Sequence, residues 1–404
     1  MNRKKIFAVI ITVAAVINST ACQSKEEKYH IKTKDAAYYD MSYNVYENGL
    51  LYTVPNASGT QACFLDYETM NGVPLCNKPN CTHSDSSCVS NLCAGSFMVP
   101  VIYHDYVYWF ASNYEIVDSQ DGKSQTADMH TKCMRARLDT GLTETFAEID
   151  GVYMQNQIDL AIVNDTMYII GSKEIYQETD GTWGGFSRSG EQYLYSINLD
   201  SAEVQNYGLI NDAPTAKYNW SYGASLWSEV KMEGIYHDKL YLYYRYVKDP
   251  QIIIDYLNTD WVENGSPRND IPWIIENKCL DLKTGEITVS DLPYAWCIGE
   301  NHYIYEENEK FFILDEDGEK TAVENMYDNE TYDFTFVNNK LWKGSINQGF
   351  DVKTDEEFSI SDKYADKDAM IMDFVDNQYV VRYVENNEVK FDRVSEQDFI
   401  GGAK

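Results

Sequence analysis

The stretch Asn164-Asp165-Thr166-Met167-Tyr168-Ile169 decides the fold, because it begins with two turn-forming residues and continues as an alternation of aromatic and aliphatic side chains. Asn and Asp tolerate the positive φ angles of tight turns, and alternating apolar side chains are typical of a strand. The stretch therefore predicts the turn of a β-hairpin and its second strand. Similar stretches recur along the chain: Glu47-Asn48-Gly49-Leu50-Leu51-Tyr52, His104-Asp105-Tyr106-Val107-Tyr108-Trp109, His237-Asp238-Lys239-Leu240-Tyr241-Leu242, Glu300-Asn301-His302-Tyr303-Ile304-Tyr305, Asn338-Asn339-Lys340-Leu341-Trp342 and Asp376-Asn377-Gln378-Tyr379-Val380-Val381.

A second pattern lies downstream of several of these hairpins. It is an apolar strand that ends in Asp and leads into a polar turn, as in Leu280-Asp281-Leu282-Lys283-Thr284-Gly285-Glu286. We interpret it as the third strand of a sheet and the tight turn into a fourth. The other examples are Phe64-Leu65-Asp66, Arg137-Leu138-Asp139-Thr140-Gly141, Asn198-Leu199-Asp200-Ser201 and Leu314-Asp315-Glu316-Asp317-Gly318.

Four strands per unit, repeated every ~40–70 residues, predict an all-β fold of the β-propeller type. The turn pattern predicts about seven blades, with six or eight as alternatives because a strand from one end of the chain can complete the blade at the other. We expect one domain over residues 36–404, with a first blade that begins near Tyr38 and a last blade that ends near Ile400. A β-sandwich does not explain turn and strand pairs along the whole chain.

The sharpest chemical signal is a loop of the form C-x4-C-x-H-x4-C, made by Cys76, Cys81, His83 and Cys88. Three thiols and an imidazole match the Cys3His ligand set of structural zinc sites, which leave no open position for catalysis. Disulfides among Cys76, Cys81, Cys88 and Cys93 are the alternative, because the chain is predicted to be exported. In either case we expect the loop to stabilise the region between the third and fourth strands of the first blade.

The N-terminus predicts export and lipid anchoring. Residues 1–21 combine a basic start, an apolar run too short to span a bilayer, and small residues that lead to Cys22. We therefore expect a signal peptide over residues 1–21, a lipid on Cys22, and a polar, flexible tether over residues 22–35. The expected location is the outer face of the cell membrane, with the lipid as the only membrane contact.

The charge of the chain excludes some classes of partner. The chain carries 33 basic and 64 acidic residues, a net charge of -31, and loss of the signal makes this more negative. Nucleic-acid binding needs a basic surface, and so does electrostatic docking on anionic lipid. We therefore expect no nucleic-acid partner.

The lipid signal, the cysteine loop and the repeats together resemble a group of uncharacterised β-propeller lipoproteins from anaerobic, gut-type Gram-positive bacteria. The segment Arg393-Val394-Ser395-Glu396-Gln397-Asp398-Phe399-Ile400-Gly401-Gly402 near the C-terminus is also similar. The resemblance implies a fold and a location. It implies no established activity.

The sequence favours a binding protein over an enzyme, because it contains no G-x-S-x-G, H-E-x-x-H or phosphate-binding glycine motif. Aromatic residues in long connections are suited to stacking on a sugar ring or on peptide side chains. We expect this role for Trp183, Phe186, Trp220, Trp227 and Trp261. The alternative for these aromatics is packing in the core, because propeller blades pack aromatic side chains against one another. The partner classes are a glycan, a peptide or an envelope protein. The alternatives are a carbohydrate-active hydrolase or lyase with carboxylates on the central funnel, and an envelope-assembly protein.

Overall fold

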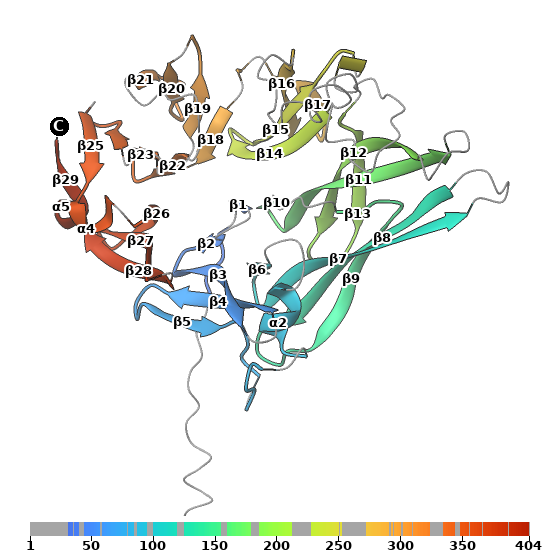
Figure 1. Cartoon of the computed structure of the whole chain (residues 1–404), viewed down its shortest axis with the longest axis horizontal. Helices are drawn as coiled ribbons and strands as arrows, with labels where there is room; N and C mark the ends of the chain where they lie inside the picture. Colours follow the sequence, from blue (N-terminus) through green and yellow to red (C-terminus); the bar gives the residue numbers. More distant parts are fainter. Residues whose placement is uncertain are drawn as a thin grey trace, which may run out of the picture.

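The chain forms a seven-bladed β-propeller, seen along the ring axis in Figure 1. This computed structural model describes residues 31–34, 36–39, 44–56, 59–78, 80–84, 87–94, 100–118, 125–154, 160–178, 186–211, 228–249, 251–252, 272–290, 292–293, 295–299, 302–308, 310–323, 334–343, 348–354, 356–365, 367–386 and 388–403. The predicted signal peptide, Cys22 and most of the predicted tether lie outside these residues. Among the described residues, no helix has the length and apolar character needed to span a membrane.

The blades follow one another along the chain, and each is an antiparallel sheet. Blade 1 contains β2 (Asn44–Tyr46), β3 (Gly49–Asn56), β4 (Gly59–Asp66) and β5 (Asn71–Pro74). Blade 2 contains β6 (Val101–Tyr103), β7 (Tyr106–Asp118), β8 (Gln125–Arg137) and β9 (Thr143–Asp150). Blade 3 contains β10 (Leu160–Val163), β11 (Thr166–Glu178), β12 (Phe186–Asn198) and β13 (Val204–Leu209). Blade 4 contains β14 (Ser228–Tyr236), β15 (Lys239–Tyr246), β16 (Ile274–Asp281) and β17 (Ile287–Val289).

The last three blades have shorter strands in general. Blade 5 contains β18 (Ala295–Gly299), β19 (His302–Glu306), β20 (Phe311–Leu314) and β21 (Lys320–Val323). Blade 6 contains β22 (Phe334–Val337), β23 (Lys340–Lys343), β24 (Gln348–Asp351) and β25 (Glu356–Ile360). Blade 7 contains β26 (Met370–Val375), β27 (Gln378–Glu385) and β28 (Glu388–Ser395). The short helices are α2 (Val89–Ala94), α4 (Asp362–Ala365) and α5 (Glu396–Phe399).

The predicted hairpin turns join the first and second strands of the blades. In blade 3, Asn164 and Asp165 have φ angles of 47° and 60°, as in a two-residue type I′ turn. The equivalent pairs in three other blades also have positive φ at both residues, and they are His237 with Asp238, Asn338 with Asn339, and Asp376 with Asn377. The sequence prediction of these turns is therefore confirmed.

The Asp residues at the ends of the third strands organise the next turn. In blade 4, Asp281 Oδ1 accepts the backbone N–H groups of Lys283 (2.9 Å) and Thr284 (2.8 Å), and Gly285 then adopts a φ of 74°. Leu282 N donates to the carbonyl of Asp238, 3.0 Å away, and this bond joins the two repeated patterns within one blade. The same bond recurs in blades 1, 2, 3 and 6, from Tyr67 to Asn48, Leu138 to Asp105, Leu199 to Asp165, and Val352 to Asn339.

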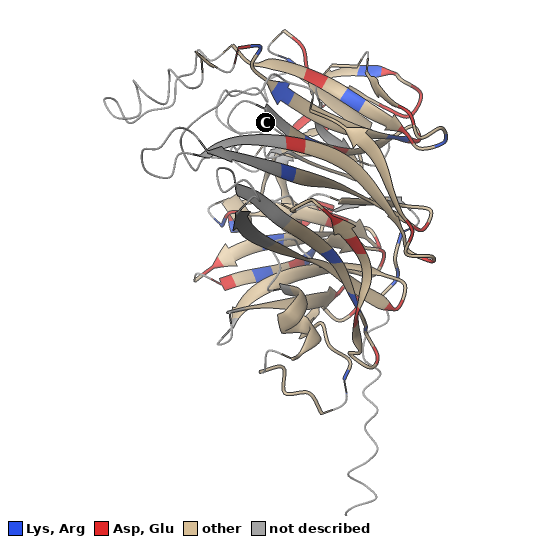
Figure 2. Cartoon of the chain, turned by 90° about the vertical axis from the view of Figure 1, so that its right-hand side faces the viewer, with Lys and Arg blue, Asp and Glu red and all other residues tan. Residues whose placement is uncertain are grey.

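Because the strands of a blade are antiparallel, its connections alternate between the two faces of the ring. We call the face with the first-to-second and third-to-fourth strand turns the turn face; Asn48, Asp165 and Thr284 mark it. The opposite face, with the second-to-third strand turns and most blade-to-blade links, is the connection face; Asn308 marks it. Figure 2 shows acidic residues at many of the turns along one side of the molecule.

Aromatic side chains fill the spaces between blades. Between blades 4 and 5, the rings of Tyr236, Tyr241 and Tyr303 have centroids 5.4 to 6.3 Å apart, and all three are buried. Ring pairs at such distances add to the free energy gained from burial. Other ring pairs, such as Tyr108 with Phe146 in blade 2, lie within one blade, so aromatic side chains pack both inside blades and between them.

The two ends of the chain differ from the prediction. Tyr38 does not begin blade 1; it lies in β1 (Ala36–Tyr39), which pairs with β10 on the inner side of blade 3, and blade 1 begins at Asn44. At the other end, β29 (Ile400–Ala403) adds to β25 on the outer side of blade 6. Among the described strands, the N-terminal strand does not complete the last blade and the C-terminal strand does not complete the first blade. The propeller therefore has seven blades.

Candidate metal centre

The cysteine loop connects blade 1 to blade 2. It begins after β5, ends before β6, and contains α2. The expected position between the third and fourth strands of blade 1 was wrong, because the third-to-fourth turn is the short turn after Asp66. Leu75 N still bonds to Ala62 O of β4 (2.8 Å), while Asn77 N bonds to Leu138 O of blade 2 (3.1 Å). The loop therefore has backbone bonds to both blades.

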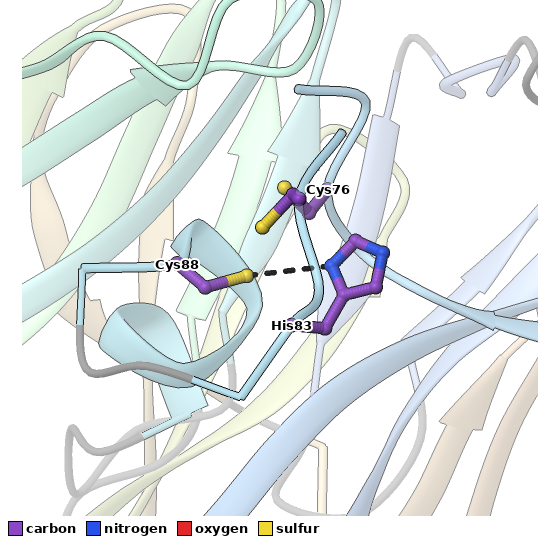
Figure 3. Close-up of side chains that lie close together, drawn as sticks. Cys76, His83 and Cys88 are labelled. Carbon is purple, nitrogen blue, oxygen red and sulfur yellow. Dashed lines mark hydrogen bonds between the residues drawn. The ribbon is translucent and has the colours of Figure 1, made fainter. Parts of the chain in front are cut away.

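The four predicted ligands converge. One ligand atom from each of Cys76, Cys81, His83 and Cys88 lies within 4.8 Å of all the others, and Figure 3 shows Cys76, His83 and Cys88 facing one another. Cys88 Sγ is 3.5 Å from His83 Nδ1. Zinc bonds of about 2.3 Å to sulfur and 2.0–2.1 Å to nitrogen place ligand atoms roughly 3.5–3.8 Å apart at tetrahedral angles. The group therefore has nearly the geometry of a Cys3His metal site.

Neighbouring side chains fix the loop around these ligands. His83 adopts a φ of 57°, and its carbonyl accepts hydrogen bonds from Gln61 Nε2 and Asn91 Nδ2, both at 3.1 Å. Ser90 Oγ lies 3.0 Å from Cys88 Sγ. Such outer contacts orient metal ligands. The sequence did not predict these roles of Gln61 and Asn91. The available signal was the polar side chain of Gln61 within strand β4.

The environment is unfavourable for thiolates in the absence of a cation. Burial, together with the nearby Cys88 and Cys81, raises the pKa of Cys76 to about 12, although the backbone N–H of Lys78 acts in the opposite direction. Cys76 and Cys88 are buried, and Cys81 and His83 are partly exposed. A divalent cation would offset the cost of burying thiolates here.

The disulfide alternative is not the arrangement in the structure. All seven cysteines whose side chains are described, including Cys76, Cys81, Cys88 and Cys93, are thiols. Cys93 is buried in α2, where its Sγ lies 3.9 Å from Ser90 O, and it is not one of the four converging groups. The structure therefore separates Cys93 from the cluster, as the zinc interpretation requires.

The predicted ligand-binding aromatics are not tested. Trp183, Trp220, Trp227 and Trp261 lie outside the described residues, as does Cys22. Phe186 is the first residue of β12, and only its backbone is described. Their role in binding stays a prediction.

Blade 7 contains a mostly buried carboxyl, near Tyr67 of blade 1, that sequence reasoning missed. Asp373, on the innermost strand of blade 7, has a raised pKa because burial outweighs the lowering effects of Lys34 and of the Phe374 backbone N–H. The signal was an Asp within the apolar run Met370-Ile371-Met372-Asp373-Phe374. Figure 1 shows that β1 also lies inside the ring, next to β10.

Comparisons with known proteins do not assign the chain to a family. No family model and no curated protein matches the sequence. Among solved structures, an oligogalacturonate lyase in complex with manganese has a TM-score of 0.40 and 9% identity, over 90% of this chain and 92% of that one. The oligogalacturonate lyase of Vibrio parahaemolyticus has a TM-score of 0.39 and 8% identity, over 89% of each chain.

An acylaminoacyl peptidase of Pyrococcus horikoshii has a TM-score of 0.42 and 13% identity, over 90% of this chain and 52% of that chain, about half its length. Similarities at this level carry no argument about function.

Proposed function

We propose that this protein is a lipid-anchored, extracytoplasmic β-propeller that binds a ligand or partner, and that a structural zinc ion in the Cys3His cluster joins its first two blades. The convergence of four ligand atoms within 4.8 Å carries the zinc part of this proposal. Four protein ligands complete a tetrahedral shell, so the ion has a structural role and no open position for substrate.

The placement of the long connections supports a binding function. Trp183 occurs between β11 and β12, shortly before Phe186 at the start of β12. Trp220 and Trp227 occur between β13 and β14, and Trp261 occurs between β15 and β16. The strand ends that flank these segments all belong to the connection face. Surface connections held by a rigid scaffold are common binding sites. The connection face of blades 3 and 4 is therefore the proposed binding region for a glycan or peptide.

The hydrolase or lyase alternative requires two carboxylates about 5–10 Å apart in an accessible funnel. The pairing of β1 with β10 favours binding over this alternative, because β1 occupies space at the inner edge of blade 3. The assembly-protein alternative requires a contiguous apolar surface. The most exposed large apolar side chains that are described, Leu142 and Val289, belong to different blades.

Metal analysis of the purified full chain tests the zinc proposal. We expect one zinc ion per chain, lost in Cys88→Ser and retained in the matched control Cys93→Ser. Chelation should lower the thermal midpoint of the wild-type protein and leave that of Cys88→Ser unchanged, because metal binding contributes directly to folding free energy. A zinc-free wild-type protein, or equal zinc in both variants, would contradict the proposal.

A glycan and peptide array tests the binding proposal. We expect saturable binding that is lost in Trp183→Ala and kept in Leu142→Ala, a control at an exposed apolar residue of blade 2. Turnover of an arrayed glycan would instead support the hydrolase or lyase alternative.

A further inference from the structure

The N-terminal segment enters the ring on the turn face. Lys32 O accepts the backbone N–H of Glu47 at 3.1 Å, and Lys32 N donates to Asn48 Oδ1 at 2.8 Å. Glu47 and Asn48 form the turn between β2 and β3. Ile31, the first described residue, is buried in the core cluster of blades 1 to 3. The first described residues of the chain therefore lie at the turn face.

The direction of β1 agrees with this path. Ala36, its first residue, pairs with Val163, which borders the turn at Asn164 and Asp165. Tyr39, its last residue, pairs with Leu160, farther from the turn face. The chain thus enters at the turn face and runs along β10 toward the connection face, before β2 begins at Asn44.

The length of the preceding chain limits how the protein is placed on a membrane. Ile31 lies nine residues after Cys22, and a fully extended chain of nine residue steps spans about 30 Å. For a bilayer against the connection face, a chain that passes outside the ring would have to cross the width of blade 1, about 14 Å for four strands, and then its height. Strand β3 has eight residues, which at ~3.3 Å each give roughly 26 Å of height. The path of about 40 Å exceeds the reach.

We infer that the turn face points toward the membrane and that the connection face points away from it, available to a partner outside the cell. This orientation rests on the proposed lipid on Cys22. The turn face carries ion pairs such as Asp238 with Lys283, and the chain has a net charge of -31, so its charge gives no attraction to an anionic bilayer. The orientation is therefore imposed by tether length and not by surface adhesion.

Energy transfer from the protein to a membrane dye tests this orientation. Blade 5 offers a matched pair of exposed positions that β20 joins: Asp317 on the turn face and Asn308 on the connection face. A fluorescent amino acid would replace one or the other in the full lipidated chain, because thiol labelling would modify the cysteine cluster. The chain would be reconstituted in phosphatidylcholine vesicles that contain an acceptor dye on the headgroup.

We expect higher transfer efficiency from position 317 than from position 308. Insertion of twenty flexible residues between Lys28 and Tyr29 should remove most of this difference, because the longer tether reaches past the ring. Equal or reversed efficiencies with the natural tether would overturn the orientation. Cys22→Ala separates the two proposals: if it attaches to vesicles as well as wild type does, the lipid anchor itself is wrong.

Discussion

At the residue scale, the fold depends on a few polar side chains in special positions. Lys340 is the clearest case: 6% of its side chain is exposed, and its Nζ lies 2.6 Å from Asp351 Oδ2 and 3.3 Å from Glu396 Oε1. These contacts join two strands of blade 6 to α5, which follows blade 7. A buried charge of this kind depends on its partners, whereas an exposed ion pair contributes little.

Lys340→Met should therefore destabilise the protein by about 3–5 kcal/mol, because it leaves the carboxylate of Asp351 without its buried partner. Lys283→Met is the matched control, since Lys283 Nζ also lies 2.6 Å from a carboxylate, that of Asp238, but both side chains are mostly exposed. We expect a loss below about 1 kcal/mol for the control. Urea unfolding of both variants measures the difference, and equal losses would contradict this account.

We expect Asp373 to make the stability of the folded protein depend on pH in an unusual direction for a carboxyl group. Its pKa in the folded protein is raised from the ordinary value of 3.8 by burial, so the folded state binds the proton more tightly than the unfolded state. This group therefore contributes stability as the pH falls through its folded pKa toward 3.8, and it is destabilising above the folded pKa. Asp373→Asn should raise the urea midpoint at neutral pH and flatten this part of the pH profile. A lower midpoint at neutral pH would show that the carboxylate is stabilising.

At the element scale, the two-residue turns set the register of each hairpin. Asn338 and Asn339 occupy the left-handed region, with φ angles of 51° and 60°, and they bring Val337 opposite Lys340. In that region the Cβ of most residues meets the following carbonyl. Asn relieves part of this strain, and Gly relieves all of it.

We expect Asn339→Val to lower the free energy of unfolding by about 1–2 kcal/mol, because a β-branched side chain is strained at a positive φ. Asn339→Gly at the same position should leave stability equal or slightly higher. Thermal and urea unfolding of the two variants test this order. A stable Val variant would mean that the turn tolerates another backbone conformation.

At the scale of the whole molecule, the ring closes by contacts between blades 7 and 1. Arg393 Nη1 donates to Tyr67 O of blade 1 at 2.8 Å, while Arg393 Nη2 lies 3.1 Å from Asp376 Oδ2 of blade 7. The rings of Tyr52 and Phe391 add an edge contact at 5.0 Å between centroids. After blade 7, the chain continues through α5 to β29, which covers the outer edge of blade 6.

Removal of residues 400–404 should expose the edge of β25, including the paired residue Ile360. Exposed strand edges promote association, so we expect a lower thermal midpoint and larger species in sedimentation velocity. Deletion of Lys404 alone is the control and should behave as wild type. A truncated protein that is monomeric and equally stable would show that β29 is dispensable.

The sequence by itself determined the local chemistry: the turn at Asn164 and Asp165, the turn organised by Asp281, and the three thiols and one imidazole of the cysteine loop. These features depend on side chains close together in the chain, and their spacing is sufficient to predict them. Only the tertiary structure decided that β1 lies inside the ring, that β29 joins blade 6, and that the cysteine loop links two blades. A strand at a chain end pairs with an unpaired strand edge that lies next to it in the folded ring, as β1 does with β10 and β29 with β25. That choice depends on contacts between blades that no local pattern records.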